Sequence, residues 1–429
     1  MYFLGIDFGT SGARSCVIDA KGTLIAEDQR DFGKLQDYER ADIWREALWD
    51  LVTALPLSVR SQLSSIACDG TSGTVLACDE TLTPRHPPLL YNDDRAIDEA
   101  KLIASLAPPG HPAAAVTSGL AKVLWLKKWL GHTGARIYLN QADWLSGLLT
   151  EQAGFSDYHN ALKMGLDLDT LSWPSWVDHL ADRRYLPTLV APGSQLAPVS
   201  RPRARYLGVN SSCRVHAGTT DSIAAFLAAG VSQSGAAVTS LGSTLVLKLL
   251  SDKRVESTEH GVYSHWFGAR WLAGGASNAG GAVLRQFFDD PTLASLSEKI
   301  DPSIASPLDY LPLPRRGERF PINDPELAPR LAPRPSDDTE FLHGLLESLG
   351  RIEARGYGLL AELGATPLRQ VETAGGGAQN PAWTTIRQRL LKVPVTRATH
   401  TEAAYGAALL ARDGKEHFDN TPGKPASYY

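Results

Sequence analysis

The sequence has few cysteines and no long apolar run. Four cysteines occur in 429 residues, with neither a CxxC pair nor a His/Cys cluster at zinc spacing. This excludes a disulfide framework and a structural zinc site, and it favours a reducing, cytoplasmic location. No apolar stretch approaches the ~18 residues of a membrane span, and the first residues lead straight into an expected strand. We therefore expect neither a membrane anchor nor a signal peptide.

The chain also lacks an excess of positive charge and several common catalytic motifs. Its formal net charge is −5, which argues against nucleic acid as the main partner. It has no GxxxxGK[ST], strict GxGxxG, HExxH or GxSxG sequence, which excludes a P-loop kinase, a zincin and a serine hydrolase by motif. With 43% hydrophobic and 21% charged residues, the composition is that of a globular protein long enough for two domains.

The most informative segment is Asp7-Phe8-Gly9-Thr10-Ser11-Gly12, which lies between two apolar runs. We expect residues 2–6 and 16–18 to form neighbouring strands, joined by a turn whose successive N–H groups form an anion-binding concavity. A carboxylate such as Asp7 would repel a phosphate bound there unless a cation lay between them, so the segment points to a nucleotide phosphate with Mg²⁺. A tight hairpin with a polar turn explains this segment alone equally well.

A related pattern recurs in the second half, where Gly242-Ser243-Thr244 separates two apolar runs. Two such hairpins, each opening about half of the chain, indicate a duplicated fold with one phosphate loop in each half. The repeat favours phosphate binding over a simple turn. We expect the first domain to end near Gly230, with residues 231–236 as the linker.

Asp221 is the sharpest candidate for a catalytic group. It follows Gly218-Thr219-Thr220 and stands just before an expected helix, where Asp is a favoured N-cap. It also falls between the two expected lobes, where a cleft would lie. A carboxylate there could accept the proton of a substrate hydroxyl as its oxygen attacks phosphorus.

Three glycines, Gly375-Gly376-Gly377, come before another expected helix, which begins with Asn380 as N-cap and Pro381. They form either a flexible turn or a surface where a nucleotide approaches bare backbone and a helix N-terminus, and we favour the second. Trp383 could flank an adenine ring, although a core tryptophan is at least as common.

Two polar clusters remain open between two explanations. Residues 69–73 and 92–95 each follow an apolar run, and each could be a surface turn or could bind a polyol through several hydroxyl contacts. The sequence alone does not decide between them.

Other segments predict regular structure from their periodicity and turn signals. Helices are expected at 42–55 with Asp42 as N-cap, at 123–130, 141–151, 341–363, 380–392 and 402–410, and strands at 66–68 and 74–78. Gly356 and Gly358 are candidate kink positions in the fourth helix. The Pro- and Arg-rich stretch 312–335 predicts a long loop, and the tail after Gly414 predicts a loosely held end.

Taken in order, these segments resemble the FGGY carbohydrate kinases, over residues 1 to about 412. Residues 7–11 resemble the family's first phosphate loop and 241–244 its second. Residues 90–95 resemble its "WxDxR" segment, 120–126 its "LAKLLWL" helix, 317–325 its "GERxPxxDP" loop, 375–383 its adenosine motif and 402–410 its closing helix. Asp221 falls on the family's catalytic aspartate.

The resemblance implies an α/β fold of two ribonuclease H-like (actin-like ATPase) domains flanking a cleft. Residues 1–230 would carry the sugar site and the base, joined by the tail from about 404–429, and 231–403 would bind ATP. The implied catalytic residues are Asp221, Asp7 and Thr10, with Asp7 holding Mg²⁺ through water. The implied sugar-binding residues are Thr71, Ser72, Asp93, Asp221 and Ser222. The implied ATP-binding residues are Thr10, Ser11, Gly12, Arg14, Gly242, Ser243, Thr244, Gly280, Gly376, Gly377, Asn380 and Trp383.

Departures from the family fall in the expected sugar site. Familiar xylulokinases carry Met-His-Gly where this chain has residues 69–73, and the family's Trp is Tyr91. The Thr-Ser-Gly variant is similar to ribulokinases and to plant and cyanobacterial xylulokinase-like branches, which implies D-xylulose or D-ribulose as substrate. The alternatives are a glycerol or tetritol kinase and a non-metabolic actin-like ATPase. We expect sugar and ATP as partners of a monomer or homodimer, with no nucleic acid and no membrane.

Overall fold

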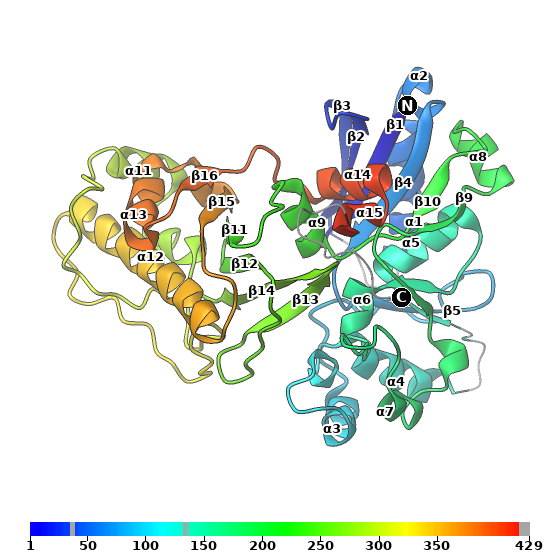
Figure 1. The fold of residues 1–429 in the computed structure, drawn as a ribbon, viewed down its shortest axis with the longest axis horizontal. Helices are drawn as coiled ribbons and strands as arrows, with labels where there is room; N and C mark the ends of the chain where they lie inside the picture. Colours follow the sequence, from blue (N-terminus) through cyan, green and yellow to red (C-terminus); the bar gives the residue numbers. More distant parts are fainter. Residues whose placement is uncertain (35–38, 132–134, 136, 420–429) are drawn as a thin grey trace. The chain divides into compact units, whose positions relative to one another are not determined.

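The computed structural model describes residues 1–34, 39–131, 135 and 137–419. These residues form two compact units (Figure 1). Unit 1 comprises Met1–Ala228 together with the described residues from Glu402 onward, and unit 2 comprises Ala229–Thr401.

Unit 1 is built on a six-stranded sheet in the order β3-β2-β1-β4-β10-β9. The pairs β1/β2 and β2/β3 are antiparallel, and β1, β4 and β10 run parallel. The hairpin predicted around residues 9–12 is therefore confirmed. The strands are β1 (Tyr2–Phe8), β2 (Gly12–Asp19), β3 (Leu24–Asp31), β4 (Leu63–Gly70), β9 (Gln195–Pro198) and β10 (Arg214–His216).

Unit 2 repeats this arrangement in a second six-stranded sheet, ordered β13-β14-β12-β11-β15-β16. Here β11 pairs antiparallel with β12 and parallel with β15, as β1 does with β2 and β4. The predicted duplication is confirmed. The strands are β11 (Ala236–Leu241), β12 (Leu245–Ser251), β13 (Tyr263–Phe267), β14 (Arg270–Ser277), β15 (Gln370–Ala374) and β16 (Val395–Arg397).

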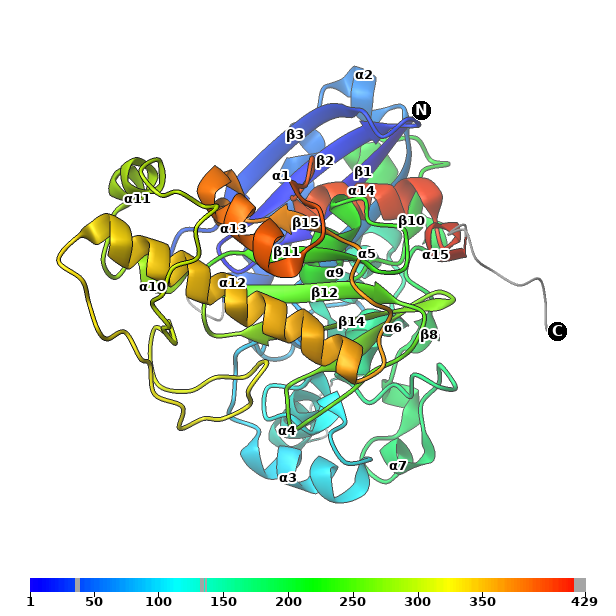
Figure 2. The same ribbon diagram turned by 60° about the vertical axis from the view of Figure 1, so that its left-hand side comes forward.

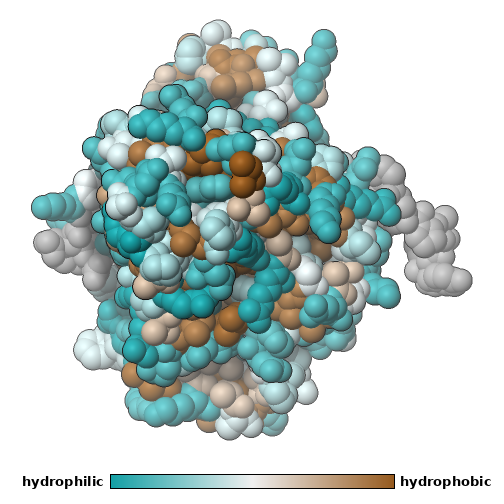
Figure 3. Space-filling view, turned by 90° about the vertical axis from the view of Figure 1, so that its left-hand side faces the viewer, coloured by the Kyte–Doolittle hydropathy of each residue, from teal (hydrophilic) through white to brown (hydrophobic). Residues whose placement is uncertain are grey.

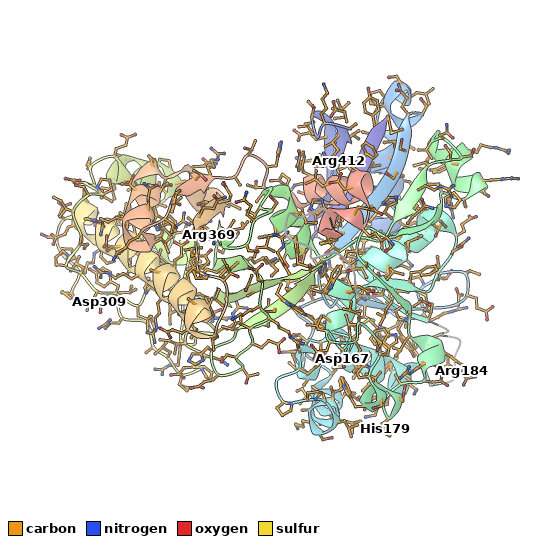
Figure 4. All side chains as sticks on the ribbon, in the orientation of Figure 1. Asp167, His179, Arg184, Asp309, Arg369 and Arg412 are labelled. Atoms are coloured by element: carbon orange, nitrogen blue, oxygen red, sulfur yellow. The ribbon has the colours of Figure 1, made fainter. Side chains whose placement is uncertain are left out.

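In unit 1, helix α14 (Ala403–Asp413) packs against both β1 and α9 (Asp221–Ala228), and Figure 4 labels Arg412 on it. Two glycines make this packing close. A Cβ on Gly5 would lie 2.0 Å from the carbonyl oxygen of Ala404, and one on Gly406 would lie 1.8 Å from that of Ala224. Such distances require glycine, so the small residues of α14 fix α9 beside β1.

The other elements of unit 1 cover the sheet and form smaller clusters beside it. The longer helices are α1 (Arg40–Thr53), α3 (Ile97–Leu106), α4 (Gly119–Leu130) and α5 (Gln141–Thr150). The short elements are α2 (Leu57–Arg60), β5 (Val75–Cys78), η2 (Pro112–Ala114), β6 (Ile137–Asn140), β7 (Phe155–Asp157), α6 (Tyr158–Leu162), α7 (Ser175–Asp178), η3 (Arg183–Tyr185), β8 (Thr188–Val190), α8 (Arg201–Leu207) and α15 (Glu416–Asp419).

In unit 2, α12 (Asp338–Glu362) and α13 (Pro381–Leu391) pack against each other, and Figure 2 shows α12 crossing the sheet. Leucines of α12, among them Leu342, Leu345 and Leu349, are buried in the core with Leu247 and Val371 of the sheet. The remaining elements are α10 (Gly281–Leu284), α11 (Asp290–Ser297) and η4 (Gly376–Gln379). No helix or strand interrupts residues 312–335, as the prolines predicted.

Most differences between the predicted and observed elements lie at the starts of helices. Helix α1 begins at Arg40, so Asp42 lies in its first turn, paired with Arg45, and is not the N-cap. Helix α4 begins at Gly119 and not at residue 123, because the Ser118 hydroxyl accepts from the Ala121 N–H at 3.1 Å. Helix α12 begins at Asp338 and runs without interruption through Gly356. That glycine gives room to the Phe320 ring, which lies 2.7 Å from where a Cβ would be.

The surface bears no sign of a large apolar face in the view of Figure 3, which is mostly hydrophilic with hydrophobic residues in small separate groups. Within the described part of the chain, no helix is both long and apolar enough to cross a membrane. The end of the predicted loose tail, from residue 420, lies outside the described residues.

Candidate active site

Two carboxyls lie side by side at the end of the unit 1 sheet. Asp7 on β1 is the register partner of Asp69 on β4, and the two side chains are 7% and 0% exposed. Apart from the neighbouring carboxyl, no described residue donates a hydrogen bond to Asp7 Oδ1 or to either carboxyl oxygen of Asp69. Burial raises the pKa of both groups, and the charges of Asp7 and Asp221 raise that of Asp69 further.

This pair fits a divalent cation that is also bound by phosphate. Mg²⁺ in nucleotide sites is typically held by one or two carboxylates together with substrate phosphates and water. Orphaned carboxyl oxygens of Asp7 and Asp69 supply the protein part of such a set. Among the described residues, no group of three or more His, Cys, Asp or Glu side chains could hold a metal by itself.

Asp221 is close enough to both carboxyls to act on their pKa values. Its negative charge raises the pKa of Asp7 and that of Asp69. Helix α9 begins at Asp221, and the carbonyl of Thr220 accepts from the N–H groups of Ile223 and Ala224. The sequence predicted that Asp221 stands just before the helix as its N-cap. Asp221 is instead the first residue of the helix. Its Oδ1 accepts from the Ser222 N–H at 2.6 Å, and the Ser222 side chain is exposed.

The loop after β4 carries two of the five predicted sugar-binding residues, Thr71 and Ser72, and they differ in exposure. The Thr71 hydroxyl is buried and lies 2.6 Å from that of Thr74, and both the N–H and the hydroxyl of Thr71 donate to Gln141 Oε1 at 3.0 Å. Thr71 thus ties the loop to α5 and is not turned outward. Ser72 is partly exposed, which suits the role predicted for it.

Two lysines outside the predicted site residues support the same loop. Lys122 on α4 is fully buried, and its Nζ lies 2.7 Å from the Gly73 carbonyl oxygen and 2.9 Å from that of Thr117. The pKa of Lys122 is lowered to about 7, chiefly by burial, which the charge of Asp93 opposes and that of Lys163 reinforces. The signal was present in the sequence, because Lys122 interrupts the apolar run 120–126.

Lys163, which follows α6, reaches the other side of this loop. Its Nζ lies 3.5 Å from the Ser72 carbonyl oxygen, and its charge interacts with that of Asp221. Burial lowers the pKa of Lys163, and Asp221 opposes that effect. A cation thus lies close to both the predicted base and a predicted sugar-binding residue.

Asp93 is paired within its own turn. Its carboxylate accepts from the Arg95 backbone N–H at 3.2 Å and from Arg95 Nε at 2.9 Å, while the guanidinium lies 5.1 Å from the centroid of the Trp125 ring. Asp93 also acts electrostatically on Lys122. The two polar clusters, 69–73 and 92–95, are therefore linked through Lys122.

Residues 9–12, predicted to be the first phosphate loop, form a tight turn with two exposed hydroxyl residues. The Gly9 N–H donates to the Gly12 carbonyl at 3.0 Å, which closes the turn and leaves Thr10 and Ser11 exposed. A Cβ on Gly12 would lie 2.6 Å from the Arg30 carbonyl oxygen. Arg14 is exposed, and its Nη1 lies 3.4 Å from Glu402 Oε2.

Residues 242–244 of unit 2, predicted to be the second phosphate loop, are joined to two neighbouring glycine turns. The Gly281 N–H donates to the Gly242 carbonyl at 2.8 Å, and the Ala282 N–H donates to the Ser243 carbonyl at 3.1 Å. A Cβ on Gly280 would lie 2.7 Å from Thr244 Cα, and one on Gly375 would lie 2.6 Å from the Leu241 carbonyl oxygen. Residues 242–244, 280–281 and 375–377 therefore meet at one edge of the unit 2 sheet.

In the predicted adenosine segment, the helix cap that the sequence predicted at Asn380 is confirmed. Asn380 caps α13, its Oδ1 accepting from the Trp383 N–H at 3.0 Å, and a Cβ on Gly376 would meet no atom within 4 Å. Trp383 is only 3% exposed, and its ring lies 2.6 Å from where a Cβ of Gly377 would be. The ring belongs to the core beneath the glycine turn, which favours the core alternative for Trp383 over contact with adenine.

Comparison with known proteins gives two consistent findings. Residues 2–228 match the sequence model of the N-terminal domain of the FGGY family of carbohydrate kinases, and residues 237–412 match that of its C-terminal domain. A curated xylulose kinase from Staphylococcus xylosus is 23% identical over 451 residues, covering 97% of this chain and 92% of the relative.

Solved structures give the same fold. A xylulose kinase from Brucella ovis superposes with a TM-score of 0.86 at 22% identity, covering 100% of this chain and 94% of the other. A xylulose kinase from Rhodospirillum rubrum gives a TM-score of 0.83 at 19% identity, covering 97% and 92%. The expected two-domain actin-like ATPase fold is confirmed.

Proposed function

Because the chain belongs to the FGGY family of carbohydrate kinases, we propose that it transfers the γ-phosphoryl group of ATP to the terminal hydroxyl of a ketopentose, D-xylulose or D-ribulose. The products are the sugar 5-phosphate and ADP. In this proposal unit 1 binds the sugar and unit 2 binds the nucleotide.

The observation that supports the proposal most is the grouping of Asp221, Asp7 and Asp69 at the end of the unit 1 sheet. A sugar hydroxyl has a pKa far above 7 and is a poor nucleophile until its proton has an acceptor. Asp221 takes that proton as the hydroxyl oxygen bonds to the γ-phosphorus. The bond from that phosphorus to the β,γ-bridging oxygen breaks, and ADP leaves.

The phosphate loops supply positioning and neutralise charge. Thr10, Ser11 and residues 242–244 offer hydroxyl and backbone N–H donors, which suit the oxygens of a phosphate chain. Mg²⁺, when bound with the nucleotide, reduces the charge on its phosphates, and Asp7 with Asp69 beside it would hold the ion. Most of the rate enhancement in phosphoryl transfer comes from such positioning and electrostatic stabilisation.

Two observations support a ketopentose as the substrate: the similarity of this chain to xylulose kinases, and the residues of the loop after β4. The relatives described above are named xylulose kinases, at low identity. In this chain Ser72 is partly exposed and lies beside Lys163, so the loop offers both a hydroxyl and a cation to a polyol.

A screen of ADP release tests the proposal. The purified protein is given ATP, Mg²⁺ and, in turn, D-xylulose, D-ribulose, pentitols, hexuloses, erythritol and glycerol, and ADP is followed by a coupled assay. We expect the highest kcat/KM with one of the two ketopentoses. A higher kcat/KM with glycerol or erythritol would contradict the ketopentose assignment. ATP hydrolysis that no sugar increases would favour a non-metabolic actin-like ATPase instead.

A further inference from the structure

A fully buried polar network lies beneath the glycine turns of unit 2. It comprises Thr239 on β11, Thr373 on β15, Glu353 and Tyr357 on α12, and Arg387 on α13. Each of these side chains is at most 4% exposed. None of them belongs to the motifs that carry the proposed function.

The hydrogen bonds of this network are short, and every side-chain nitrogen and oxygen in it takes part in at least one. Arg387 Nε donates to Glu353 Oε2 at 2.6 Å and Nη2 donates to Oε1 at 2.7 Å, a bidentate pair, while Nη1 donates to the Thr373 hydroxyl at 2.8 Å. The Thr239 hydroxyl donates to Glu353 Oε1 at 2.6 Å. Since that uses its one hydrogen, the Tyr357 hydroxyl at 2.8 Å is the donor to Thr239.

The two threonines stand at matching positions just before the two loops. Thr239 and Thr373 are register partners on the parallel strands β11 and β15. Gly242 follows three residues after Thr239, and Gly375 follows two residues after Thr373. The loops touch one another, because a Cβ on Gly377 would lie 2.7 Å from Leu241 Cβ. A change in the spacing of these strands would therefore move both loops.

The third member of the arrangement is α13, which carries Arg387. Its N-terminus, capped by Asn380, lies directly after the second glycine turn. Through Arg387 and Glu353 the network joins this helix to α12 and to both strands. One set of hydrogen bonds thus fixes loop 242–244, turn 375–377 and the start of α13 relative to one another.

The buried ion pair of Arg387 and Glu353 is poorly explained by a gain in folding stability alone. Removing two charges from water costs several kcal/mol per ion in real proteins, and well-packed apolar residues often serve equally well. What an ion pair adds over an apolar contact is a fixed geometry, here between the parts proposed to bind ATP.

We propose that Thr239, Thr373, Glu353, Tyr357 and Arg387 are positioning residues that hold the two glycine loops and the start of α13 in the arrangement that binds the nucleotide. The inference rests on the proposed function. It predicts that loss of one hydroxyl weakens nucleotide binding while the sugar KM at saturating ATP stays within about twofold, since the network touches only nucleotide elements.

Thr373→Val is the sharpest variant, because it is nearly isosteric and leaves one N–H of Arg387 without its acceptor. Mutations in coupled packing networks change affinity by about 0.5–2 kcal/mol, which is about 2- to 30-fold in Kd. Thr373→Ser keeps the hydroxyl and should bind nearly as wild type does. Ser264→Ala is the matched control. Ser264 is equally buried on the edge strand β13, away from the loops, and its hydroxyl bonds the backbone N–H and carbonyl of Val255.

The measurement is calorimetric titration with a nonhydrolysable ATP analogue and Mg²⁺, together with the melting temperature of each variant. The inference predicts a raised Kd for Thr373→Val alone among the three variants. If Thr373→Val and Ser264→Ala lower the melting temperature alike and neither raises the Kd, the network is only structural and the inference is wrong. Failure of the wild-type protein to bind the analogue at all would instead contradict the proposed function.

Discussion

The buried lysine of α4 makes the stability of unit 1 depend on pH in a direction opposite to an ordinary surface lysine. Lys122 Nζ faces two carbonyl oxygens, at 2.7 and 2.9 Å, and a neutral amine has two N–H donors to match them. Burial lowers the pKa of this amine from 10.5 to about 7. In the unfolded chain the amine keeps its ordinary value.

The sign follows from proton binding. Between about pH 7 and pH 10.5 the unfolded chain binds a proton that the folded protein does not, so the free energy of unfolding rises with pH across this window. The full effect is about 5 kcal/mol at 1.36 kcal/mol per unit, and the part between pH 7 and pH 9 is about 2 kcal/mol. For a unit of this size that corresponds to roughly 4–8 °C in melting temperature.

The assay compares melting temperatures at pH 7 and pH 9 for the wild type, Lys122→Met and Lys128→Met. The other titrating groups are common to the three proteins, so their contributions cancel in the differences, apart from the interactions of Asp93 and Lys163 with Lys122. Between pH 7 and pH 9, the melting temperature of the wild type should rise by roughly 4–8 °C more than that of Lys122→Met. Lys128→Met alters an exposed lysine of the same helix and should follow the wild type. Equal pH responses of the wild type and Lys122→Met would refute the reasoning.

Substitutions at three further positions test other parts of the account. Gly376→Asp should weaken ATP binding at least about tenfold in calorimetry through charge repulsion, and Gly376→Ala, whose Cβ meets no protein atom, should weaken it less; wild-type binding by Gly376→Asp would remove Gly376 from the site. Gly406→Ala should destabilise by about 1–3 kcal/mol in denaturant unfolding, because its Cβ would clash with the Ala224 carbonyl; an unchanged midpoint would contradict the close packing of α14. Lys163→Met should lower kcat/KM for the sugar and leave the Kd of the ATP analogue unchanged; the reverse pattern would place Lys163 outside the sugar site.

The sequence predicted the sheets better than the helix starts. Apolar runs around Gly/Ser/Thr turns are a strong local signal, and both hairpins formed where they were expected. Helix starts depend on single caps that compete along the chain. Ser118 caps α4, so the helix begins at Gly119, four residues before the start that the apolar periodicity predicted.

The site residues divide in the same way. Backbone loops were found because glycine marks them, whereas the state of a polar side chain depends on partners far along the chain. Thr71 is held by Gln141, and Trp383 packs under Gly377 in the core. Asp69 and Lys163 become notable only through their neighbours in space, Asp7 in one case and Ser72 with Asp221 in the other. No spacing rule in the sequence brings such residues together.

Single-site replacement of Asp221 tests the central claim most directly. Asp221→Asn keeps the shape of the side chain and removes its basicity, and Asp289→Asn is the matched control at the start of α11, where the carboxylate caps the helix. Positioned general bases typically contribute about 10²–10⁴-fold in rate, whereas Asn caps helices about as well as Asp. We predict that kcat on the best sugar falls by about 10²-fold or more for Asp221→Asn, with ATP still bound and Asp289→Asn unaffected. A folded Asp221→Asn protein with near-wild-type turnover would contradict the account.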